Sequence, residues 1–389
     1  MMRRFNLYFA QNRVVWLLSF AICAGCDSPL VVPVSEHVEY ILPAHASCFR
    51  WRVIGEGQEP QRCLEIMKPG ELGLIATVYL DSMAFKLDRR DSGEAVVVGP
   101  RERGIMTLST THVSLMEAWD LTLKHWKGGA YTKFIRTEVA QTRLLDKSAW
   151  DISGEPEIDR EKLIAIHPAV LTIYPFGDPL SGTSLNEHTP VVPILEYLEP
   201  NPLGRAEWMC VFGWMMGDSA ERNSRLAFEE IESHYLELKR AVPLKKEKLR
   251  VFTGSVQQGT WHAPGGSSFI AQLLKDAGVE YILQDQAGRE NIEIPLEEMM
   301  VLTQSADAWG LVLHYPGLFG KEELMASDER HAWLMPASGK VFVANTSDCD
   351  YFGWWVSRPD AMLENLIALF HPDLIQVQSD QSCFAWIAL

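Results

Sequence analysis

Two ring-rich segments contain the residues best suited to bind a ligand. Residues 259–269 read GTWHAPGGSSF, so Trp261 and His262 precede a glycine pair and a serine that can cap the next helix. Residues 351–359 read YFGWWVSRP and place Trp354 among four rings. Exposed rings beside a few polar groups bind flat or partly apolar ligands. We therefore predict ligand contacts for Trp261, His262 and Trp354. For Trp261, packing at a lobe interface is the alternative.

A charged pair follows the strand-like stretch TPVVPILEYL. Arg205 and Glu207 lie just after the turn EPNPLG, where an open α/β sheet would bind its ligand. The planar guanidinium of Arg205 matches the geometry of a carboxylate. We expect Arg205 to contact an anionic ligand, and a structural ion pair is the alternative.

The sequence contains no complete catalytic signature. It has no P-loop, no GxGxxG opening a helix, no HExxH, no GxSxG and no CxxC. Its histidines, among them His112 and His262, lack the spacing of a metal site. We therefore expect a protein that is not an enzyme and holds no resident cofactor or metal. The competing hypothesis is a secreted two-lobe enzyme that uses Glu199 or Glu207 with His262 as acid and base.

The charge balance narrows the class of partner. The 389 residues carry 51 acidic and 35 basic side chains, which gives a net charge of -16. Repulsion argues against nucleic acid, and against an anionic membrane surface, as the principal partner. A basic docking partner is favoured instead. The chain is also longer than one ordinary core of about 100–200 residues, so two lobes are expected.

The first 26 residues have the pattern of an export signal. Arginines precede the apolar run 14–24, which is too short to span a bilayer and ends in small residues. Ala24-Gly25-Cys26 resembles the lipobox of bacterial lipoproteins, although Cys23 replaces the usual aliphatic residue. We predict lipidation at Cys26 and a periplasmic protein anchored to the cell membrane or the outer membrane. Simple cleaved export is the alternative.

Export would place the remaining cysteines in a compartment where disulfides form. Cys48 and Cys63 flank a turn within a strand-like stretch. A hairpin disulfide and two buried free thiols both fit this pattern, so the pairing stays open.

The hydrophobic pattern divides the chain after the signal into four parts. Residues 27–100 alternate short apolar strands with turns, which predicts a β-rich N-terminal segment. Residues 101–216 and 244–389 alternate strands with helical runs. This order is typical of α/β lobes with a central parallel sheet.

Residues 217–243 lie between the two predicted lobes and read as one long helix. Phe228, Ile231, Tyr235 and Leu238 recur at intervals of three and four residues and so form one apolar stripe. A helix of about 25 residues reaches about 37 Å, roughly the width of a lobe. We therefore predict two Rossmann-like lobes bridged by one long helix.

Five stretches from Gly104 to the C-terminus, taken in order, point to a family. They read GIMTLSTTHVSLMEAWDL, EPEIDREKLIAIHPAVLTIY, VVPILEYLEPNPLGRAEWM, GTWHAPGGSSFIAQLLKDAGVEYI and SRPDAMLENLIALFHPDL. Together they resemble the substrate-binding lipoproteins of ABC importers for iron-siderophore complexes, cobalamin and haem. The resemblance implies two α/β lobes with a fairly rigid linking helix and a ligand held in the cleft. Ala169 departs from the pattern, because an aspartate often follows the proline at this place.

The resemblance also implies a function and a set of contacts. The protein would capture a metal chelate, above all an iron-siderophore complex, and deliver it to an ABC permease. The expected cleft residues are His112, Tyr174, Tyr197, Arg205, Trp208, Trp261, His262 and Trp354. Cobalamin or haem is the alternative ligand, with His112 or His262 as an axial metal ligand. A surface lipoprotein that serves an outer-membrane receptor without an ABC partner is a further alternative.

In proteins of this kind a glutamate on each lobe docks onto arginines of the permease. Glu161, in REKLIAIHP, stands where the first lobe's glutamate is expected. Glu297 and Glu298, in IPLEEMMVL, are both candidates for the second lobe. Surface solvation is the alternative role for each of them.

Overall fold

The structure is a computed structural model that describes residues 39–54, 61–69, 73–81, 94–154, 158–175, 188–243, 246–376 and 382–387. These residues belong to one compact unit, Glu39–Leu389. The predicted export signal and Cys26 lie outside the described residues. Within the described ranges, no helix is both long enough and apolar enough to cross a bilayer.

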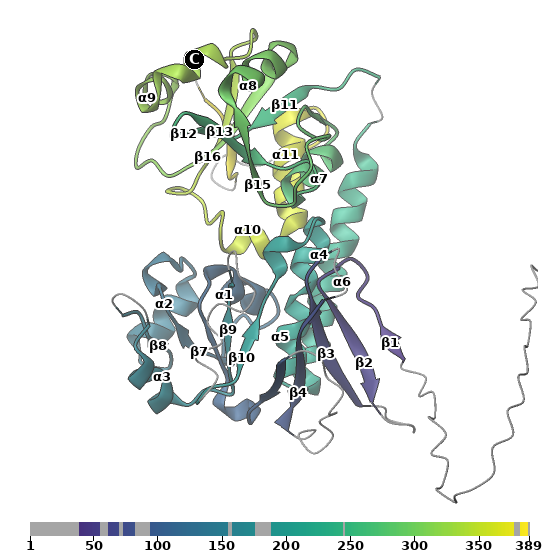
Figure 1. The fold of residues 1–389 in the computed structure, drawn as a ribbon, viewed down its shortest axis with the longest axis vertical. Coiled ribbons are helices and arrows are strands. Elements are labelled where there is room, and N and C mark those ends of the chain that lie inside the picture. The colour runs from purple at the N-terminus through teal and green to yellow at the C-terminus, as the bar shows by residue number, and fades with distance from the viewer. Residues whose placement is uncertain are drawn as a thin grey trace, which may run out of the picture. The chain divides into compact units, whose positions relative to one another are not determined.

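The first sheet forms from residues near the N-terminus (Figure 1, purple). Its strands, in spatial order, are β1 (Tyr40–Ile41), β2 (Phe49–Ile54), β3 (Gln61–Met67), β4 (Leu74–Leu80) and β5 (Glu94–Val98). Neighbours pair antiparallel except β4 and β5, which are parallel. The Phe49 ring packs edge-on against Trp208, and Trp51 against Trp214, so this sheet buries its rings on the following lobe.

The first α/β lobe has a sheet whose five strands are all parallel. They are β6 (Ile105–Thr107), β7 (Trp126–Gly129), β8 (Trp150–Asp151), β9 (Val170–Ile173) and β10 (Val191–Pro193), in the order β10-β9-β6-β7-β8. The helices are α1 (Thr110–Glu117), α2 (Glu138–Leu145) and α3 (Arg160–Ile166), with short 3-10 turns at Arg101–Arg103, Thr132–Phe134 and Glu196–Leu198. Ser109, Thr137 and Asp159 begin the three helices by accepting backbone N–H groups of the first turn.

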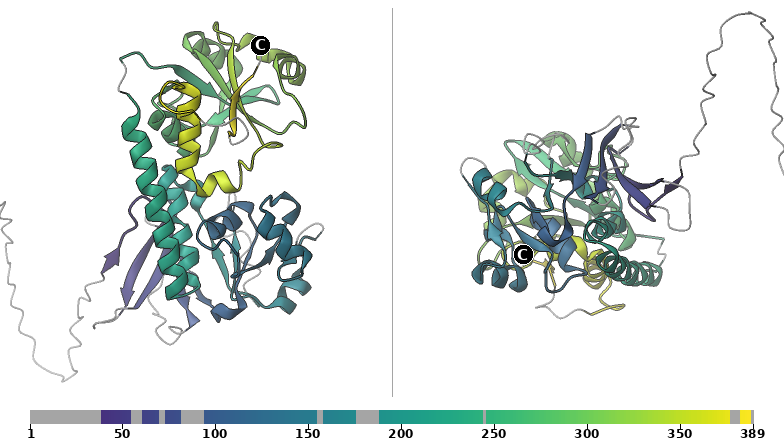
Figure 2. Two further views of the ribbon diagram at one scale, coloured as in Figure 1. Left: turned by 180° about the vertical axis from the view of Figure 1, so that it is seen from behind. Right: turned by 90° about the horizontal axis from the view of Figure 1, so that it is seen from below.

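Three consecutive helices leave this lobe: α4 (Pro202–Glu207), α5 (Met209–Met215) and α6 (Asp218–Ala241). The predicted stripe of α6 is confirmed, because Phe228, Ile231, Tyr235 and Leu238 are all buried. α6 packs against α5 and against α11 (Pro359–Phe370) of the second lobe. Figure 2 shows the long helix running beside both lobes. It is therefore the bridge that the sequence predicts.

The second lobe contains two sheets. The larger consists of β11 (Arg250–Thr253), β14 (Glu280–Tyr281), β16 (Ala308–Leu313), β17 (Lys340–Asn345) and β18 (Phe384–Trp386), in the order β14-β11-β16-β17-β18 with β18 antiparallel. The smaller, antiparallel sheet consists of β12 (Ser255–Gln257), β13 (Thr260–Pro264) and β15 (Asn291–Pro295). The remaining helices are α7 (Phe269–Asp276), α8 (Leu296–Leu302), α9 (Lys321–Ser327) and α10 (Trp354–Ser357), with 3-10 turns at Thr303–Ser305 and Glu329–Trp333. The predicted fold class is confirmed.

The segment around Trp261 differs from its predicted loop. Thr260–Pro264 is a strand, so successive side chains point to opposite faces. Trp261 points inward, is fully buried and packs against Phe252 and Trp309. Its Nε1 donates to the carbonyl of Thr253 at 3.2 Å. The prediction that Trp261 contacts ligand is wrong, because this ring belongs to the core of the second lobe.

The structure also decides between the two alternatives for Cys48 and Cys63, a hairpin disulfide or two free thiols. Cys48 and Cys63 are buried free thiols, and the register of β2 with β3 pairs Cys63 with Arg52 rather than with Cys48. Cys349 and Cys383 form a disulfide whose Cα atoms are 5.4 Å apart.

Two carboxylates attach the N-terminal sheet to the first lobe. Glu207 accepts the backbone N–H groups of Ala44, His45 and Ala46 at 2.7–2.8 Å. Glu199 accepts the N–H groups of Ser47 and Cys48 at 2.7 and 2.9 Å. Charge-assisted bonds of this kind are stronger than neutral ones. Five successive backbone donors are thus satisfied by two side chains 150 or more residues away.

Glu207→Ala should lower the free energy of unfolding by roughly 2–5 kcal/mol, because it leaves three part-buried donors without an acceptor. Urea unfolding monitored by circular dichroism measures this change. Glu229→Ala, on an exposed face of α6, is the matched control and should change stability by less than about 0.5 kcal/mol. Equal stability of the two variants would contradict the anchoring role.

Candidate functional site

The two lobes share a cavity of about 370 Å³. Its first wall lies at the carboxyl ends of β9 and β10 and on α4. Its second wall is formed by strands and helices of the second lobe, among them β12, β13, β16, α7 and α11, and by the loops between them. The polar and aromatic lining residues include Tyr174, Tyr197 and Arg205 from the first lobe and Ser255, His262, Phe269, Arg289, Glu290, Tyr351 and Phe352 from the second. The cavity, called the cleft below, therefore combines arginines with aromatic rings.

Arg205 is the buried cation of the cleft. Asn201 starts α4 by accepting the Leu203 N–H at 2.9 Å, and Pro202 occupies the first helical position. α4 then holds Arg205 with only 9% of the residue exposed, and its guanidinium lies 4.5 Å from the centre of the Phe269 ring. Within the described residues, Arg205 donates no hydrogen bond and its Nε is buried without a partner.

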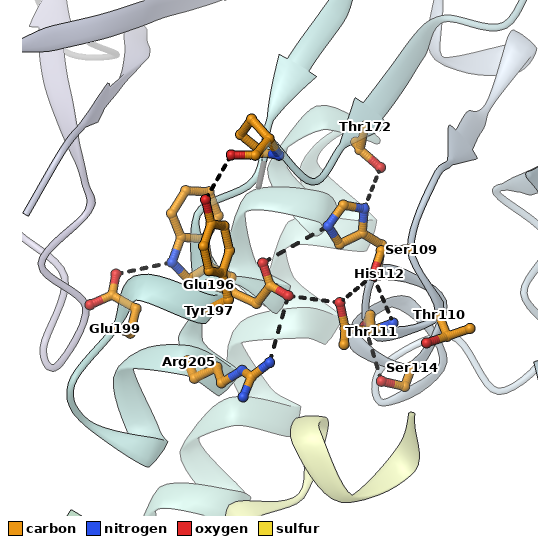
Figure 3. Close-up of polar contacts among 12 residues, drawn as sticks. Ser109, Thr110, Thr111, His112, Ser114, Thr172, Glu196, Tyr197, Glu199 and Arg205 are labelled. Atoms are coloured by element: carbon orange, nitrogen blue, oxygen red, sulfur yellow. Dashed lines mark hydrogen bonds and ion pairs between the residues drawn. The ribbon is translucent and has the colours of Figure 1, made fainter. Parts of the chain in front are cut away.

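Behind Arg205 lies a fully buried polar chain, shown in Figure 3. Glu196 Oε1 lies 3.9 Å from Arg205 Nη2, which is beyond hydrogen-bond distance, and accepts the Thr111 hydroxyl at 2.7 Å. His112 Nδ1 lies 3.0 Å from Thr172 Oγ1, and His112 Nε2 lies 3.9 Å from Glu196 Oε2. These polar side chains thus form a row that leads from the cleft wall to β9 in the sheet of the first lobe.

Burial sets the charge states of the ionisable residues in this row of polar side chains. It lowers the pKa of His112 from 6.5 to about 3, and a hydrogen bond with Thr172 opposes only part of this change. Burial raises the pKa of Glu196, and the nearby charge of Arg205 and the Thr111 hydroxyl oppose it. Burial also lowers the pKa of Arg205, which Glu196 opposes. His112 is therefore neutral at pH 7 and contributes no positive charge to the cleft.

Tyrosines supply neutral donors around the arginine. The rings of Tyr174 and Tyr197 lie 4.3 Å apart, and the Tyr197 hydroxyl donates to the carbonyl of Pro175 at 2.9 Å. Burial raises the pKa of Tyr174 and of Tyr351 to about 12. Both phenols therefore keep their protons at neutral pH and can donate to an anion.

Arg289 brings a second guanidinium to the cleft from the second lobe. Its Nη1 lies 3.4 Å from the carbonyl of Leu198 and 3.5 Å from the hydroxyl of Ser47, so it reaches the first lobe. These long contacts leave donors available to a ligand. The sequence gives no sign of this role, since Arg289 stands in a polar turn, AGREN, without neighbouring rings.

The segment 347–356 connects the lobes on the opposite side of the cleft. Arg136 donates to the carbonyl of Ser347, and Ser114 to that of Gly353, at 2.9 and 2.8 Å. The Cys349–Cys383 disulfide holds the same segment to β18. Tyr351 and Phe352, two and three residues after Cys349, line the cleft. This part of the cleft wall is therefore held to both lobes.

The structure brings four of the eight predicted ligand residues to the cleft: Tyr174, Tyr197, Arg205 and His262. His262 faces the cleft because it alternates with Trp261 along β13. Within the YFGWW segment the lining residues are Tyr351 and Phe352, whereas the half-exposed Trp354 lies outside the lining and packs on Trp355 and Arg358.

Two further predicted contacts need correction. His112 is fully buried in the chain behind Arg205 and does not line the cleft, so it cannot reach a metal there in this conformation. Trp208 is also fully buried, because it packs on Phe49 and donates to Glu199 at 3.0 Å. Both side chains lie in the protein interior and do not line the cleft.

The residues of the competing enzyme hypothesis do not come together. Glu199 and Glu207 are occupied by the backbone of residues 44–48, and neither lines the cleft that His262 faces. A general base must lie within hydrogen-bond reach of the proton that it takes. This arrangement therefore offers no acid and base pair of the kind proposed.

The three glutamates predicted to dock are on the surface. Glu161 is exposed in the first turn of α3, and Glu297 and Glu298 are exposed in the first turn of α8. The first lobe thus carries one of them and the second lobe two, all in the first turn of a helix, where the helix dipole favours a carboxylate. Their role stays a prediction.

Comparison with known proteins agrees with this fold. Residues 105–331 match the family profile described as periplasmic binding protein. A relative described as an uncharacterized lipoprotein of Methanocaldococcus jannaschii is 25% identical over 287 residues, and the match covers 69% of this chain and 65% of that relative. The chain thus spans less than two thirds of that protein's length.

Solved structures show the same fold at low identity. A periplasmic haem-binding protein of Pseudomonas aeruginosa is 14% identical, with a TM-score of 0.52 over 74% of this chain and 98% of that one. The siderophore-binding protein FhuD of Vibrio cholerae, bound to Fe3+-Desferal, is 16% identical, with a TM-score of 0.51 over 69% and 98%. A periplasmic binding protein of Veillonella parvula is 12% identical, with a TM-score of 0.54 over 72% and 93%.

The depressed pKa of His112 predicts a loss of stability in acid. Below pH 6.5 His112 takes up a proton in the unfolded chain, whereas in the folded chain it takes up this proton only near pH 3. Protonation therefore favours the unfolded chain, so the contribution of His112 to the free energy of unfolding is highest above pH 6.5 and decreases as the pH falls toward 3. In His112→Gln the free energy of unfolding should therefore fall less steeply between pH 6 and pH 4, by up to about 1.4 kcal/mol per pH unit.

Urea unfolding at several pH values measures this slope. His188→Gln, at an exposed position, is the control and should keep the wild-type slope. Glu196 acts in the opposite sense above pH 4.5 but is present in all three proteins. Parallel pH profiles for the wild type and His112→Gln would show that His112 is not held neutral.

Proposed function

The chain belongs to the periplasmic binding protein family, and we propose that it captures an iron-siderophore-type chelate in the cleft and delivers it to the permease of an ABC importer. The protein makes and breaks no bond in this function. It binds the chelate outside the cell membrane, to which a lipid on Cys26 would hold it, and releases it to the permease.

The observation that supports this ligand class best is the state of Arg205. A guanidinium has five N–H donors, and a buried one without hydrogen bonds is costly. Within the described residues Arg205 uses none of its donors, and Glu196 stays 3.9 Å away because it is engaged by Thr111. An anionic ligand in the cleft would satisfy this group.

The remaining lining selects a large anion with apolar surface. Phe269, Tyr174 and Phe352 offer ring faces, and the protonated phenol of Tyr351 offers a donor. Catecholate and hydroxamate chelates of iron combine anionic oxygens with flat or apolar surfaces. A small hydrophilic anion would leave these rings in contact with water.

Haem or cobalamin is the second candidate, because one histidine does face the cleft. His262 lines it and is part-exposed, which suits an axial metal ligand. His112 no longer supports this alternative. A visible spectrum that shifts on binding haem in the wild type, and remains unshifted in His262→Ala, would favour it over a siderophore.

Arg205→Gln should weaken binding of a ferric siderophore about tenfold to a hundredfold, since a hydrogen bond to a charged group contributes about 1.5–3 kcal/mol. Quenching of intrinsic tryptophan fluorescence measures the dissociation constant, with ferric catecholates, ferric hydroxamates, haem and cobalamin as separate titrants. The protein is the chain from residue 27, which keeps the whole compact unit Glu39–Leu389.

Arg225→Gln, on the exposed side of α6, is the matched control and should bind like the wild type. Equal melting temperatures would show that both variants are folded. The proposal fails if no titrant gives saturable quenching, or if Arg205→Gln binds as tightly as the wild type.

Docking is tested separately from ligand capture. Glu161→Lys, and Glu297→Lys with Glu298→Lys, should leave the siderophore dissociation constant within about twofold, because these residues lie outside the cleft. They should reduce uptake by proteoliposomes that contain the permease at least tenfold, since like charges would then meet at the interface. Glu229→Lys is the control. Unchanged uptake by both docking variants would refute the assignment.

A further inference from the structure

A second cavity, of about 500 Å³, lies on the first lobe and shares no residue with the cleft. Gly104 and Lys127 place it at the amino-terminal ends of β6 and β7, the edge of the sheet opposite to the cleft. Residues 119–125 and the first turns of α6 complete it. We refer to it as the amino-edge cavity.

Three cationic side chains line the amino-edge cavity, in a protein whose net charge is -16. Lys124 and Lys127 form no ion pair with any residue that the structure describes. Arg101 has an ion pair with Glu102 at 3.6 Å, but the two side chains are 60% and 75% exposed. Such exposed pairs are weak, so all three cations remain available.

Two carboxylates of the lining, Asp120 and Glu102, offset part of this positive charge. Asp120 Oδ1 accepts the hydroxyl of Thr122 at 2.7 Å, and its Oδ2 accepts the backbone N–H of His125 at 3.4 Å. Asp120 therefore folds its own loop. Asp218, the first residue of α6, stabilises the charged form of Arg62. Asp120 keeps its negative charge, so three cations face two carboxylates in the lining.

The start of α6 adds backbone donors. Gly217 precedes this 24-residue helix and has no side chain to cap it, and Ser219 and Ala220 of the first turn line the cavity. The first N–H groups of a helix have no partner within the helix and favour an anion. Gly217 has φ of 94°, and a Cβ there would lie 2.3 Å from Arg101 Nη1. The positive φ favours glycine at this position, and the absence of a side chain leaves room for the Arg101 guanidinium beside the helix start.

Trp119 brings an indole N–H donor to the wall of the cavity. It lines the amino-edge cavity and is 8% exposed, and its Nε1 donor is buried without a hydrogen-bond partner within the described residues. Buried donors of native proteins are almost always paired. Beside it, burial lowers the pKa of His125, the charge of Asp120 opposes this change, and the charges of Lys124, Lys127 and Arg101 add to it. All three cations of the lining therefore lie close enough to act on one neighbouring ring.

We propose that the amino-edge cavity binds a phosphoryl group, held by Lys124, Lys127, Arg101 and the first N–H groups of α6. A tetrahedral oxyanion offers acceptors in several directions, which suits donors that converge from a loop, a strand and a helix start. The group could belong to free phosphate or to a phospholipid headgroup, since the recognising chemistry is the same. This site is independent of the function proposed for the cleft.

Calorimetric titration of the chain from residue 27 with inorganic phosphate, at low ionic strength and pH 7, tests the site. Sedimentation with phosphatidylglycerol vesicles, against phosphatidylcholine vesicles, tests the lipid source. We expect saturable binding to phosphate or to the anionic vesicles, weakened at least tenfold in the double variant Lys124→Gln/Lys127→Gln. Glu102→Gln should tighten it, because it removes the opposing charge.

The double variant Lys275→Gln/Lys321→Gln is the matched control, since it removes two exposed positive charges from the second lobe. It should bind like the wild type. Unaltered melting temperatures would show that the variants are folded. The proposal is overturned if neither phosphate nor anionic vesicles bind, or if both double variants weaken binding equally, which would indicate an effect of net charge alone.

Discussion

A buried guanidinium, that of Arg205, is the constraint on which the arrangement of the cleft depends. Removing a cation from water is costly unless other groups compensate, and here the compensation is incomplete. Glu196 stays 3.9 Å away, and the face of Phe269 covers the group from the second lobe. The residues described around it therefore fix the position of the guanidinium but accept none of its hydrogen bonds.

Keeping α4 in place requires an anchor on its other side. Arg205 and Glu207 stand two residues apart on this short helix, and they serve different parts of the molecule. Arg205 lines the cleft, whereas Glu207 accepts three backbone N–H groups that precede β2. The N-terminal sheet thus stabilises the helix that carries the cation. A segment that lies before the stretches resembling the family thus still contributes to the geometry of the site.

Much of this architecture follows from local sequence patterns. The stripe from Phe228 to Leu238 predicts α6, and the turn before Arg205 correctly places that residue at the carboxyl edge of the sheet. The failures have a common cause, since side-chain direction depends on context. Trp261 and His262 are neighbours, and a strand in place of the expected loop sends one to the core and the other to the cleft. Trp208 is hidden by the N-terminal sheet, and Arg289 acts only through a contact between lobes. The residues next to Trp208 and Arg289 in the sequence predict neither of these contacts.

The disulfide between Cys349 and Cys383 makes one part of the cleft wall depend on the redox conditions around the protein. The two cysteines are 34 residues apart, and both shortly precede rings that line the cleft. Tyr351 and Phe352 follow the first cysteine by two and three residues, and Phe384 directly follows the second. The parallel sheets can form by hydrophobic burial alone, in any redox environment. The aromatic wall becomes covalently fixed only where thiols are oxidised. Under reducing conditions the lobes and their hydrogen bonds to residues 347–353 would hence remain, but the segment that carries Tyr351 and Phe352 would lose its covalent link to β18.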